Sequence, residues 1–205
     1  MDWSHFGCHR HFGRNILRFQ RIDMELSLVE ITKIEEVGLG DRVCIDTDTE
    51  LKLGEGMLIG SLSRGMFLVH SETVENPYVE TRPFRVNAGP VSAYVLVPGG
   101  KTRYLVELKG GDPVIAVDSN GKEREVKVVR SKIETRPFLL VEAKLGEVEF
   151  HSFLQNAETI RLVTEDGKAV SVVNLKPGDK VLALVDKEGM GRHFGMAVEE
   201  TIIEK

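Results

Sequence analysis

The sequence lacks the features that mark secreted, membrane-spanning or nucleic-acid-binding proteins. Its 205 residues include two cysteines, Cys8 and Cys44, which are too few for a disulfide framework and indicate a reducing compartment. No apolar run reaches the length of a membrane span, and the N-terminus lacks the apolar core of a signal peptide. A formal net charge of -5 and a pI near 5.7 disfavour general binding to nucleic acid or anionic membranes. We therefore expect a soluble, cytoplasmic protein with no nucleic-acid or membrane partner.

The common nucleotide and hydrolase motifs are also missing. Gly99-Gly100-Lys101-Thr102 resembles the end of a P-loop, but Val95 stands where the motif needs its earlier glycine. The run Gly54–Gly60 misses the spacing of a dinucleotide-binding loop by one residue. No Gly-x-Ser-x-Gly elbow occurs. These absences exclude the motif-based assignments of a nucleotide or hydrolase site.

The N-terminal segment differs from the rest of the chain. Residues 1–21 carry four arginines and one acidic residue, a local charge of +3 in an acidic protein. Four possible soft metal ligands fall within seven positions: His5, Cys8, His9 and His11. A structural zinc site usually draws its ligand pairs from two separated turns, and the sequence has no second cluster of such residues. We therefore predict no metal site, and a poorly ordered leader over residues 1–23.

From residue 24 onward the chain alternates short apolar segments with glycine-rich turns. Asp118–Gly121 and Glu165–Gly167 are typical hairpin turns, because asparagine and glycine tolerate a positive φ. Strands are predicted over 27–34 and 41–46, separated by a turn at Gly38–Gly40, and later strands follow the same pattern. The prediction is a mainly β fold of repeated small β-barrel or hairpin modules, with at most short helices, one of them near Asn156.

Internal repeats support that organisation. Glu-Thr-Arg-Pro-Phe occurs at 80–84 and at 134–138 and could aim Arg82 and Arg136 alike. Leu108–Asp112 is matched by Leu175–Asp179, each followed by an apolar strand, and 37–43 is a fainter third copy. Turn chemistry alone also explains the Gly-Asp pairs. The repeats divide a 24–205 domain at about 24–86, 87–155 and 156–205.

Several long strings carry a family resemblance over roughly 24–205. They are GDRVCIDT, GEGMLIGSLSRGMFLVHSE, NPYVETRPFRVNAGPVSAYVLVPGGKTRYL, FLQNAETIRLV and GRHFGMAVEETIIEK. They resemble the C-terminal portion of archaeal-type 3-dehydroquinate synthase. The resemblance implies an enzyme of aromatic amino-acid biosynthesis with NAD as its cofactor. It implies oxidative deamination of 2-amino-3,7-dideoxy-D-threo-hept-6-ulosonate and cyclisation of the product to 3-dehydroquinate.

That chemistry suggests roles for individual side chains. The substrate carboxylate favours arginine as its partner, because the guanidinium can bind both carboxylate oxygens. The candidate arginines are Arg64, Arg82, Arg85 and Arg192, and Lys101 is a further candidate contact. Proton transfer is assigned to His70, Glu72 and His193. Asn87, Asn156 and Glu158 are assigned to orienting the cofactor. Ordinary ion pairs, a structural histidine and a helix cap are the alternative explanations.

Three classes of function remain open at this stage. The first is the enzyme itself, and the second is a folded remnant that is inactive without the portion completing the NAD site. The third is a non-catalytic β-barrel interaction module, which the acidic body and the lack of a basic, aromatic stripe disfavour. The sequence leaves the oligomeric state open.

Overall fold

A computed structural model describes residues 25–77, 79–186, 190–193 and 196–199, with side chains as far as residue 186. The described part is mainly β, as predicted, and its helices are two three-residue 3-10 turns. The strands are β1 (Ser27–Thr47), β2 (Gly56–Leu62), β3 (Gly65–His70), β4 (Arg85–Pro90), β5 (Tyr94–Val97), β6 (Lys101–Tyr104), β7 (Pro113–Val117), β8 (Glu123–Leu145), β9 (Val148–Gln155), β10 (Arg161–Val163), β11 (Ala169–Ser171), β12 (Lys180–Val185), β13 (Met190–His193) and β14 (Met196–Glu199). The 3-10 turns are η1 (Leu105–Glu107) and η2 (Val172–Asn174).

Two long strands connect the whole sheet. β1 and β8 pair antiparallel from Glu30 opposite Lys144 to Thr47 opposite Val128. The predicted turn at Gly38–Gly40 is wrong, because β1 runs through it. Gly38 takes a φ of +98° at a register shift against β8, so the glycine serves a β-bulge and not a chain reversal.

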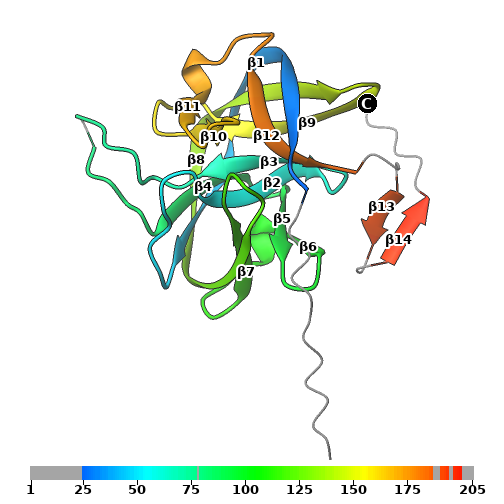
Figure 1. The fold of residues 1–205 in the computed structure, drawn as a ribbon. Helices are drawn as coiled ribbons and strands as arrows, with labels where there is room; N and C mark the ends of the chain where they lie inside the picture. Colours follow the sequence, from blue (N-terminus) through cyan, green and yellow to red (C-terminus); the bar gives the residue numbers. More distant parts are fainter. Residues whose placement is uncertain (1–24, 78, 187–189, 194–195, 200–205) are drawn as a thin grey trace, which may run out of the picture.

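Each long strand serves two lobes. The first half of β1 pairs with β12 and its second half with β4. The first half of β8 pairs with β7 and its second half with β9. Figure 1 shows β10, β11 and β12 on one side of the body, β5, β6 and β7 on the other, and β2 and β3 between them. One half of the body thus contains the first part of β1 and the second part of β8, and the other half contains the second part of β1 and the first part of β8.

The expected repeat between the two lobes is present. β5, β6, η1 and β7 follow one another as β10, β11, η2 and β12 do. The N–H of Gly111 donates to the Val128 carbonyl over 2.8 Å, and the N–H of Gly178 donates to the Ile31 carbonyl over 2.8 Å. In both turns the aspartate carboxylate accepts the backbone N–H of the lysine three residues earlier, at 3.1 Å for Asp112 and 2.8 Å for Asp179.

A third turn of this kind exists, but not where the sequence predicted it. Residues 37–43 lie inside β1, so the faint copy there is wrong. The turn Leu51-Lys52-Leu53-Gly54-Glu55 has the same carboxylate bond and the same glycine conformation: the Glu55 carboxylate accepts the Lys52 N–H at 2.8 Å, and Gly54 has a φ of +80°. Glu55 accepts the bond that aspartate accepts in the other two turns. This copy therefore lacks the Gly-Asp pair by which the repeat is recognised in the sequence.

Two further expectations about local structure are wrong. The Glu-Thr-Arg-Pro-Phe copies differ, because 80–84 lies in a loop before β4 while 134–138 lies in the middle of β8. Arg82 contacts Glu72 and Arg136 contacts Glu134, so the two arginines have unrelated surroundings. The segment after Asn156 is a turn and not a helix.

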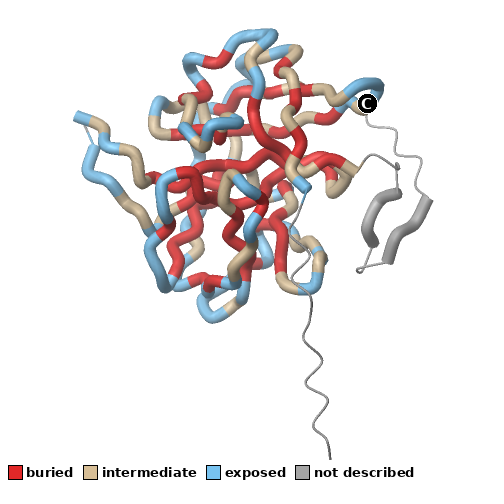
Figure 2. The backbone as a smooth tube through the Cα atoms, viewed as in Figure 1, coloured by how far each residue is buried: buried red, intermediate tan, exposed pale blue. Residues whose placement is uncertain are grey.

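The core lies between the two halves. Figure 2 shows the buried segments gathered along the middle of the body, where β2 and β3 pass, with exposed loops around them. Met57, Ile59, Phe67 and Val69 are fully buried there. Phe67 packs on Phe150 of β9 with 4.9 Å between ring centroids, which joins β3 to the long β8–β9 pair.

Candidate functional site

The strand register places a set of polar side chains on one face of β1, β4 and β8. Asp46 lies opposite Arg85 of β4 and Arg130 of β8, while Cys44 lies opposite Asn87 and Lys132. The alternate residues Val43 and Ile45 are fully buried in the core on the other face. We call the charged members of this face and the groups bonded to it the polar cluster: Arg42, Asp46, Glu72, Arg82, Arg85, Arg130, Lys132, Glu134 and Arg136.

Asp46 forms the centre of the polar cluster. Its carboxylate accepts the Arg85 Nε–H at 2.6 Å and the Arg130 Nε–H at 2.8 Å, and its side chain is 7% exposed. Burial alone would raise the pKa of Asp46, but the hydrogen bonds from the two guanidinium groups outweigh it and lower the pKa. Asp46 is therefore ionised and holds both arginines in place.

A second carboxylate, Glu134, is shared among three cations. It accepts from Arg42 Nη2 at 2.6 Å and lies 3.1 Å from both Lys132 and Arg136. The cluster holds six cationic side chains against three carboxylates, a formal surplus of three positive charges in a protein of net charge -5. This face therefore suits an anionic ligand.

The third carboxylate has a different character. Glu72 pairs with Arg82 at 3.5 Å, and its side chain is 11% exposed whereas that of Arg82 is 40% exposed. Burial raises the pKa of Glu72, although Arg85 and Arg82 oppose the shift. The structure thus brings together three of the predicted site residues, Glu72, Arg82 and Arg85. A carboxyl group with a raised pKa beside an exposed arginine can hold a proton next to a bound anion.

Cys44 lies within the face but is not a nucleophile. Burial raises the pKa of its thiol to about 11, with opposing contributions from Arg42 and Arg85. Its sulfur contacts Arg42 Nη1. The thiol is therefore neutral at physiological pH and contributes to packing.

His70 has both ring nitrogens occupied. Its Nε2 accepts the Gly54 N–H at 2.8 Å, its Nδ1–H donates to the Ser71 carbonyl at 2.5 Å, and the residue is 2% exposed. Burial lowers the pKa of His70, Arg161 adds to the shift, and the bond to Ser71 opposes it. No ring nitrogen is available to a substrate in this arrangement, so we assign His70 a structural role.

The other assigned residues do not join the polar cluster. Arg64 lies in the turn between β2 and β3, and Lys101 begins β6 on an exposed hairpin. Asn156 donates to Glu36 at 3.3 Å, and the Glu158 carbonyl accepts the Ser171 hydroxyl at 2.8 Å. Asn87 is the exception among the cofactor assignments, since it lies on the polar face and donates to Gln155 Oε1 at 2.8 Å.

Arg192 and His193 belong to β13, but their side chains lie outside the described part of the chain, as does the whole leader with His5, Cys8, His9 and His11. Within the residues that the structure describes, no group of three or more histidine, cysteine, aspartate or glutamate side chains could hold a metal ion.

Sequence reasoning assigned no site role to seven members of this face: Arg42, Cys44, Asp46, Arg130, Lys132, Glu134 and Arg136. Their alternation along 42–46 and 130–134 is a detectable signal, because every second residue is polar in both segments. Nothing in the sequence pairs the two segments, which lie more than 80 residues apart.

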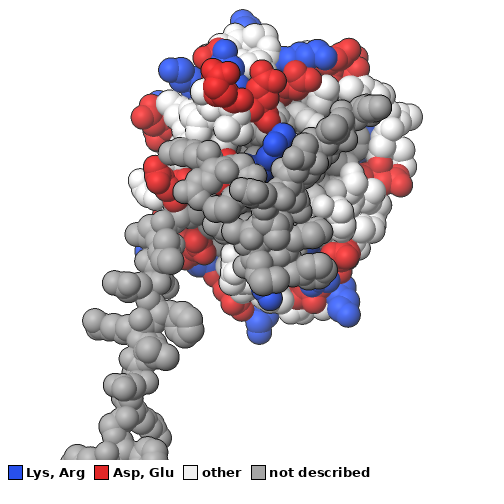
Figure 3. Space-filling model, turned by 90° about the vertical axis from the view of Figure 1, so that its right-hand side faces the viewer, with Lys and Arg blue, Asp and Glu red and all other residues white. Residues whose placement is uncertain are grey.

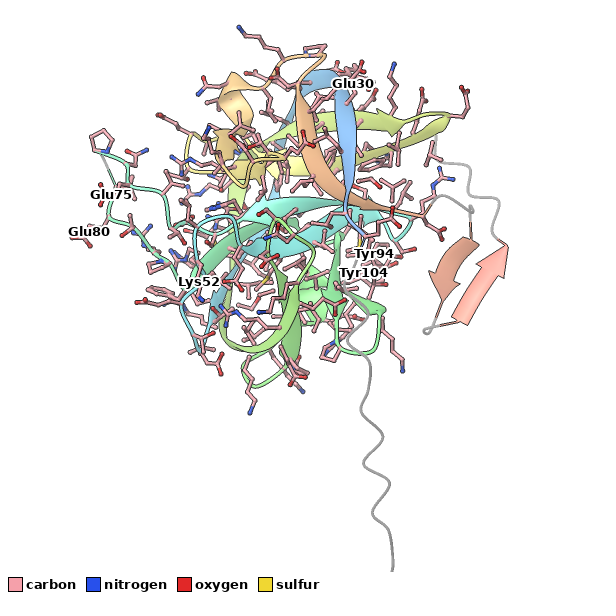
Figure 4. The ribbon with its side chains drawn as sticks, in the orientation of Figure 1. Glu30, Lys52, Glu75, Glu80, Tyr94 and Tyr104 are labelled. Carbon is pink, nitrogen blue, oxygen red and sulfur yellow. The ribbon has the colours of Figure 1, made fainter. Side chains whose placement is uncertain are left out.

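Two surface features lie elsewhere (Figure 4). The hairpin before β4 projects from the body and carries a shallow hollow lined by Glu75, Asn76, Pro77, Val79, Glu80 and Thr81. Tyr94 and Tyr104 stack with 4.5 Å between ring centroids, and their hydroxyl groups are bonded at 2.7 Å. The hollow contains two carboxylates and no cation, so it does not suit an anionic substrate.

Comparisons with known proteins identify the family. Residues 28–205 match the model of the 3-dehydroquinate synthase II C-terminal domain. This chain belongs to the 3-dehydroquinate synthase II family. It is 63% identical over 182 residues to the 3-dehydroquinate synthase of Methanopyrus kandleri, a match covering 88% of this chain and 45% of that protein. It is 63% identical over 196 residues to the Methanocaldococcus jannaschii protein of that name, covering 96% and 54%.

The chain spans about half the length of the curated 3-dehydroquinate synthases that it matches. No solved structure matches it. A search of the described residues for a helix long and apolar enough to cross a membrane finds none. The side of the molecule that Figure 3 presents carries basic and acidic side chains together, so charge of neither sign dominates the coloured surface on that side.

The residues described here do not fit NAD as a complete site. Dinucleotide folds place the pyrophosphate at a helix N-terminus, and the helices of the described part have three residues each. The hollow on the projecting hairpin carries Glu75 and Glu80, which repel phosphate.

Proposed function

We propose that this chain is the C-terminal half of an archaeal-type 3-dehydroquinate synthase acting in the cytoplasm on the pathway to aromatic amino acids. The whole enzyme converts 2-amino-3,7-dideoxy-D-threo-hept-6-ulosonate to 3-dehydroquinate by NAD-dependent oxidative deamination and cyclisation. The family match over residues 28–205 carries this proposal. The positive surplus of the polar cluster supports it, because the substrate is a carboxylate.

The residues of the polar cluster have distinct roles in this proposal. Arg82 is 40% exposed and, among the described residues, pairs with Glu72 at 3.5 Å, so its guanidinium can turn to the substrate carboxylate. Glu72 holds or accepts the proton that moves during deamination or enolate formation, since its raised pKa lies closer to neutrality. Arg85 is held by Asp46 and connects the other two, because its backbone N–H donates to the Arg82 carbonyl at 2.8 Å and its own carbonyl accepts the Glu72 N–H at 2.8 Å.

The NAD site is completed by the half of the relatives that this chain does not match. Asn87 is the one predicted cofactor residue on the polar face, and it orients groups there. A hydride acceptor supplied by the other half would make activity depend on both halves.

A complementation assay tests this proposal. The chain is mixed with the unmatched half of the Methanocaldococcus jannaschii relative, and NADH absorbance and 3-dehydroquinate are followed with the amino substrate. We expect both products from the mixture and neither from this chain alone. In the mixture, Arg82→Ala should raise KM on the order of 30-fold or more, because a charged hydrogen bond to the substrate is lost. The control Lys168→Gln should leave KM unchanged.

Glu72→Gln should lower kcat with little change in KM. If the two halves associate and yield no product, this chain is a folded remnant and the enzymatic proposal fails. Product formed by this chain alone would refute the dependence on a second half.

A further inference from the structure

We propose that the polar cluster contains a buried subsite for a carboxylate with a hydrogen-bond donor on the adjacent carbon, formed by Arg42 and Asn87. The inference deepens the proposed function and rests on it for the identity of the natural ligand. Neither residue was assigned to the substrate from the sequence.

Arg42 supplies the first observation. The residue is 5% exposed, yet its Nε–H has no hydrogen-bond partner. Buried donors are nearly always paired, because an unpaired one has lost its water without compensation. A guanidinium N–H in this state is suited to donate to a carboxylate oxygen of a ligand.

The neighbouring carboxylates cannot satisfy this Nε–H. Glu134 already binds Arg42 through Nη2 and is shared with Lys132 and Arg136. Asp46 is taken up by Arg85 and Arg130. Glu72, whose charge also acts on Arg42, pairs with Arg82 at 3.5 Å. All three carboxylates of the polar cluster thus have another cation as partner, which leaves the Arg42 Nε–H open to a carboxylate oxygen of a ligand.

Asn87 supplies the second, independent observation. It lies opposite Cys44 on the neighbouring strand and is 6% exposed. Its Nδ2 donates to Gln155, but its Oδ1 is buried and accepts from no group. An orphaned acceptor requires a donor, just as the orphaned Arg42 Nε–H requires an acceptor.

The two orphaned atoms belong to diagonal neighbours on paired strands. Arg42 precedes Cys44 by two residues, and Asn87 lies opposite Cys44. In a regular sheet diagonal neighbours have Cα atoms roughly 7–8 Å apart. Here a register shift between Val43 and Cys44 adds one residue on β4, so Arg42 itself lies opposite Pro90. Long side chains and a small molecule can close a gap of this size. One ligand with a carboxylate and an adjacent amino or hydroxyl group satisfies both atoms.

An approach from solvent exists beside Glu134. Its side chain is 25% exposed, and those of Lys132 and Arg136 are 48% and 45% exposed. These two lysine and arginine side chains can move aside at little cost, because exposed ion pairs contribute little to stability. They also attract an anion to the entrance.

Calorimetric titration of this chain tests the subsite. The probes are succinate, malate and aspartate, which share two carboxylates and differ in bearing no donor, a hydroxyl or an ammonium beside one of them. Inorganic phosphate and NAD are the other arms. We expect saturable binding of malate or aspartate at least 5-fold tighter than that of succinate.

The variants are Arg42→Lys, which keeps the charge and removes Nε, and Asn87→Ala, with Lys168→Gln as the matched control. Circular dichroism establishes that each is folded. We expect Arg42→Lys to weaken all three dicarboxylates at least 10-fold. Asn87→Ala should abolish the preference over succinate, and Lys168→Gln should change neither.

Several results would overturn the subsite. Equal affinity for the three dicarboxylates in the unaltered chain removes the role of Asn87, whatever the variants do. Tighter binding of phosphate or NAD than of any dicarboxylate shows that the oxyanion is a phosphate and refutes the carboxylate assignment. Dicarboxylate binding without turnover in the complementation assay refutes the proposed function alone, and turnover without such binding refutes the subsite alone.

Discussion

The imidazole Nε2 of His70 accepts the backbone N–H of Gly54 at 2.8 Å. In the two other turns of the same type, the corresponding glycine N–H donates to a backbone carbonyl, that of Val128 or that of Ile31. A histidine side chain thus replaces a main-chain acceptor in the third turn. The replacement explains why a histidine at a strand end is buried, neutral and unavailable for proton transfer.

The first prediction concerns this bond. His70→Ala leaves the Gly54 N–H buried without a partner and opens a cavity, so it should lower the free energy of unfolding by about 2–4 kcal/mol. His151→Gln is the control, because His151 is half-buried on β9. Urea denaturation measures both. A change below roughly 0.5 kcal/mol in His70→Ala would show that the bond is dispensable.

The second prediction is the pH dependence that follows from the same residue. The pKa of His70 is lowered below its ordinary value of 6.5, so the unfolded state binds more protons than the folded state in the window below that value. The stabilisation is complete above pH 6.5 and is lost as the pH falls toward the folded-state pKa. Denaturation at a series of pH values should show a decline that His70→Gln lacks. Parallel curves for the two proteins would contradict the assignment.

The third prediction concerns Asp46. Asp46→Asn leaves Arg85 and Arg130 without their shared counter-charge and should cost about 3–5 kcal/mol. Asp48→Asn is the matched control on an exposed carboxylate that accepts the Lys127 N–H at 3.0 Å. Thermal denaturation compares them. Similar melting temperatures for the two variants would mean that Asp46 does not organise the polar cluster.

The fourth prediction concerns the close approach of β2 and β3. A Cβ on Gly56 would overlap the Val69 carbonyl, so Gly56→Ala should cost more than about 3 kcal/mol or prevent folding. Gly146 has a φ of +60° with open space around it, so Gly146→Ala should cost only about 1 kcal/mol from backbone strain. Chemical denaturation distinguishes the two. An equal cost would indicate that the strands separate readily at Gly56.

The fifth prediction tests Cys44 with a thiol reagent. In a Cys8→Ser background, Cys44 should not react with Ellman's reagent near neutral pH, because burial raises its pKa to about 11. Adding denaturant should release one thiol per chain. Rapid reaction of the native protein would show that the face around Cys44 opens freely.

Local patterns in the sequence were enough to predict much of the fold. Alternating apolar residues and positive-φ glycines indicate a mainly β chain, and hairpin turns form at Asp118–Gly121 and before Gly167 as predicted. The paired Leu-Lys motifs predict two similar modules. These features depend on residues close in sequence, whose backbone preferences and turn hydrogen bonds act locally.

The polar cluster could be predicted only in part. Glu72, Arg82, Arg85 and Asn87 fall within one segment rich in ionisable groups, and the sequence drew attention to them. Their partners on β1 and β8 are distant in sequence, so the pairing of Asp46 with Arg130 depends on the register between two long strands. A slip of one residue would place Val129 or Ser131 there instead.

By itself, the sequence determined that this protein is mainly β, that its halves repeat and that it belongs with the 3-dehydroquinate synthases. Only the tertiary structure decided that β1 passes uninterrupted through the Gly38–Gly40 segment, that His70 serves a turn, and that three carboxylates share six cations on one face. The physical reason is that propensities and turn bonds are local, whereas burial, strand register and charge sharing exist only after distant segments pack together.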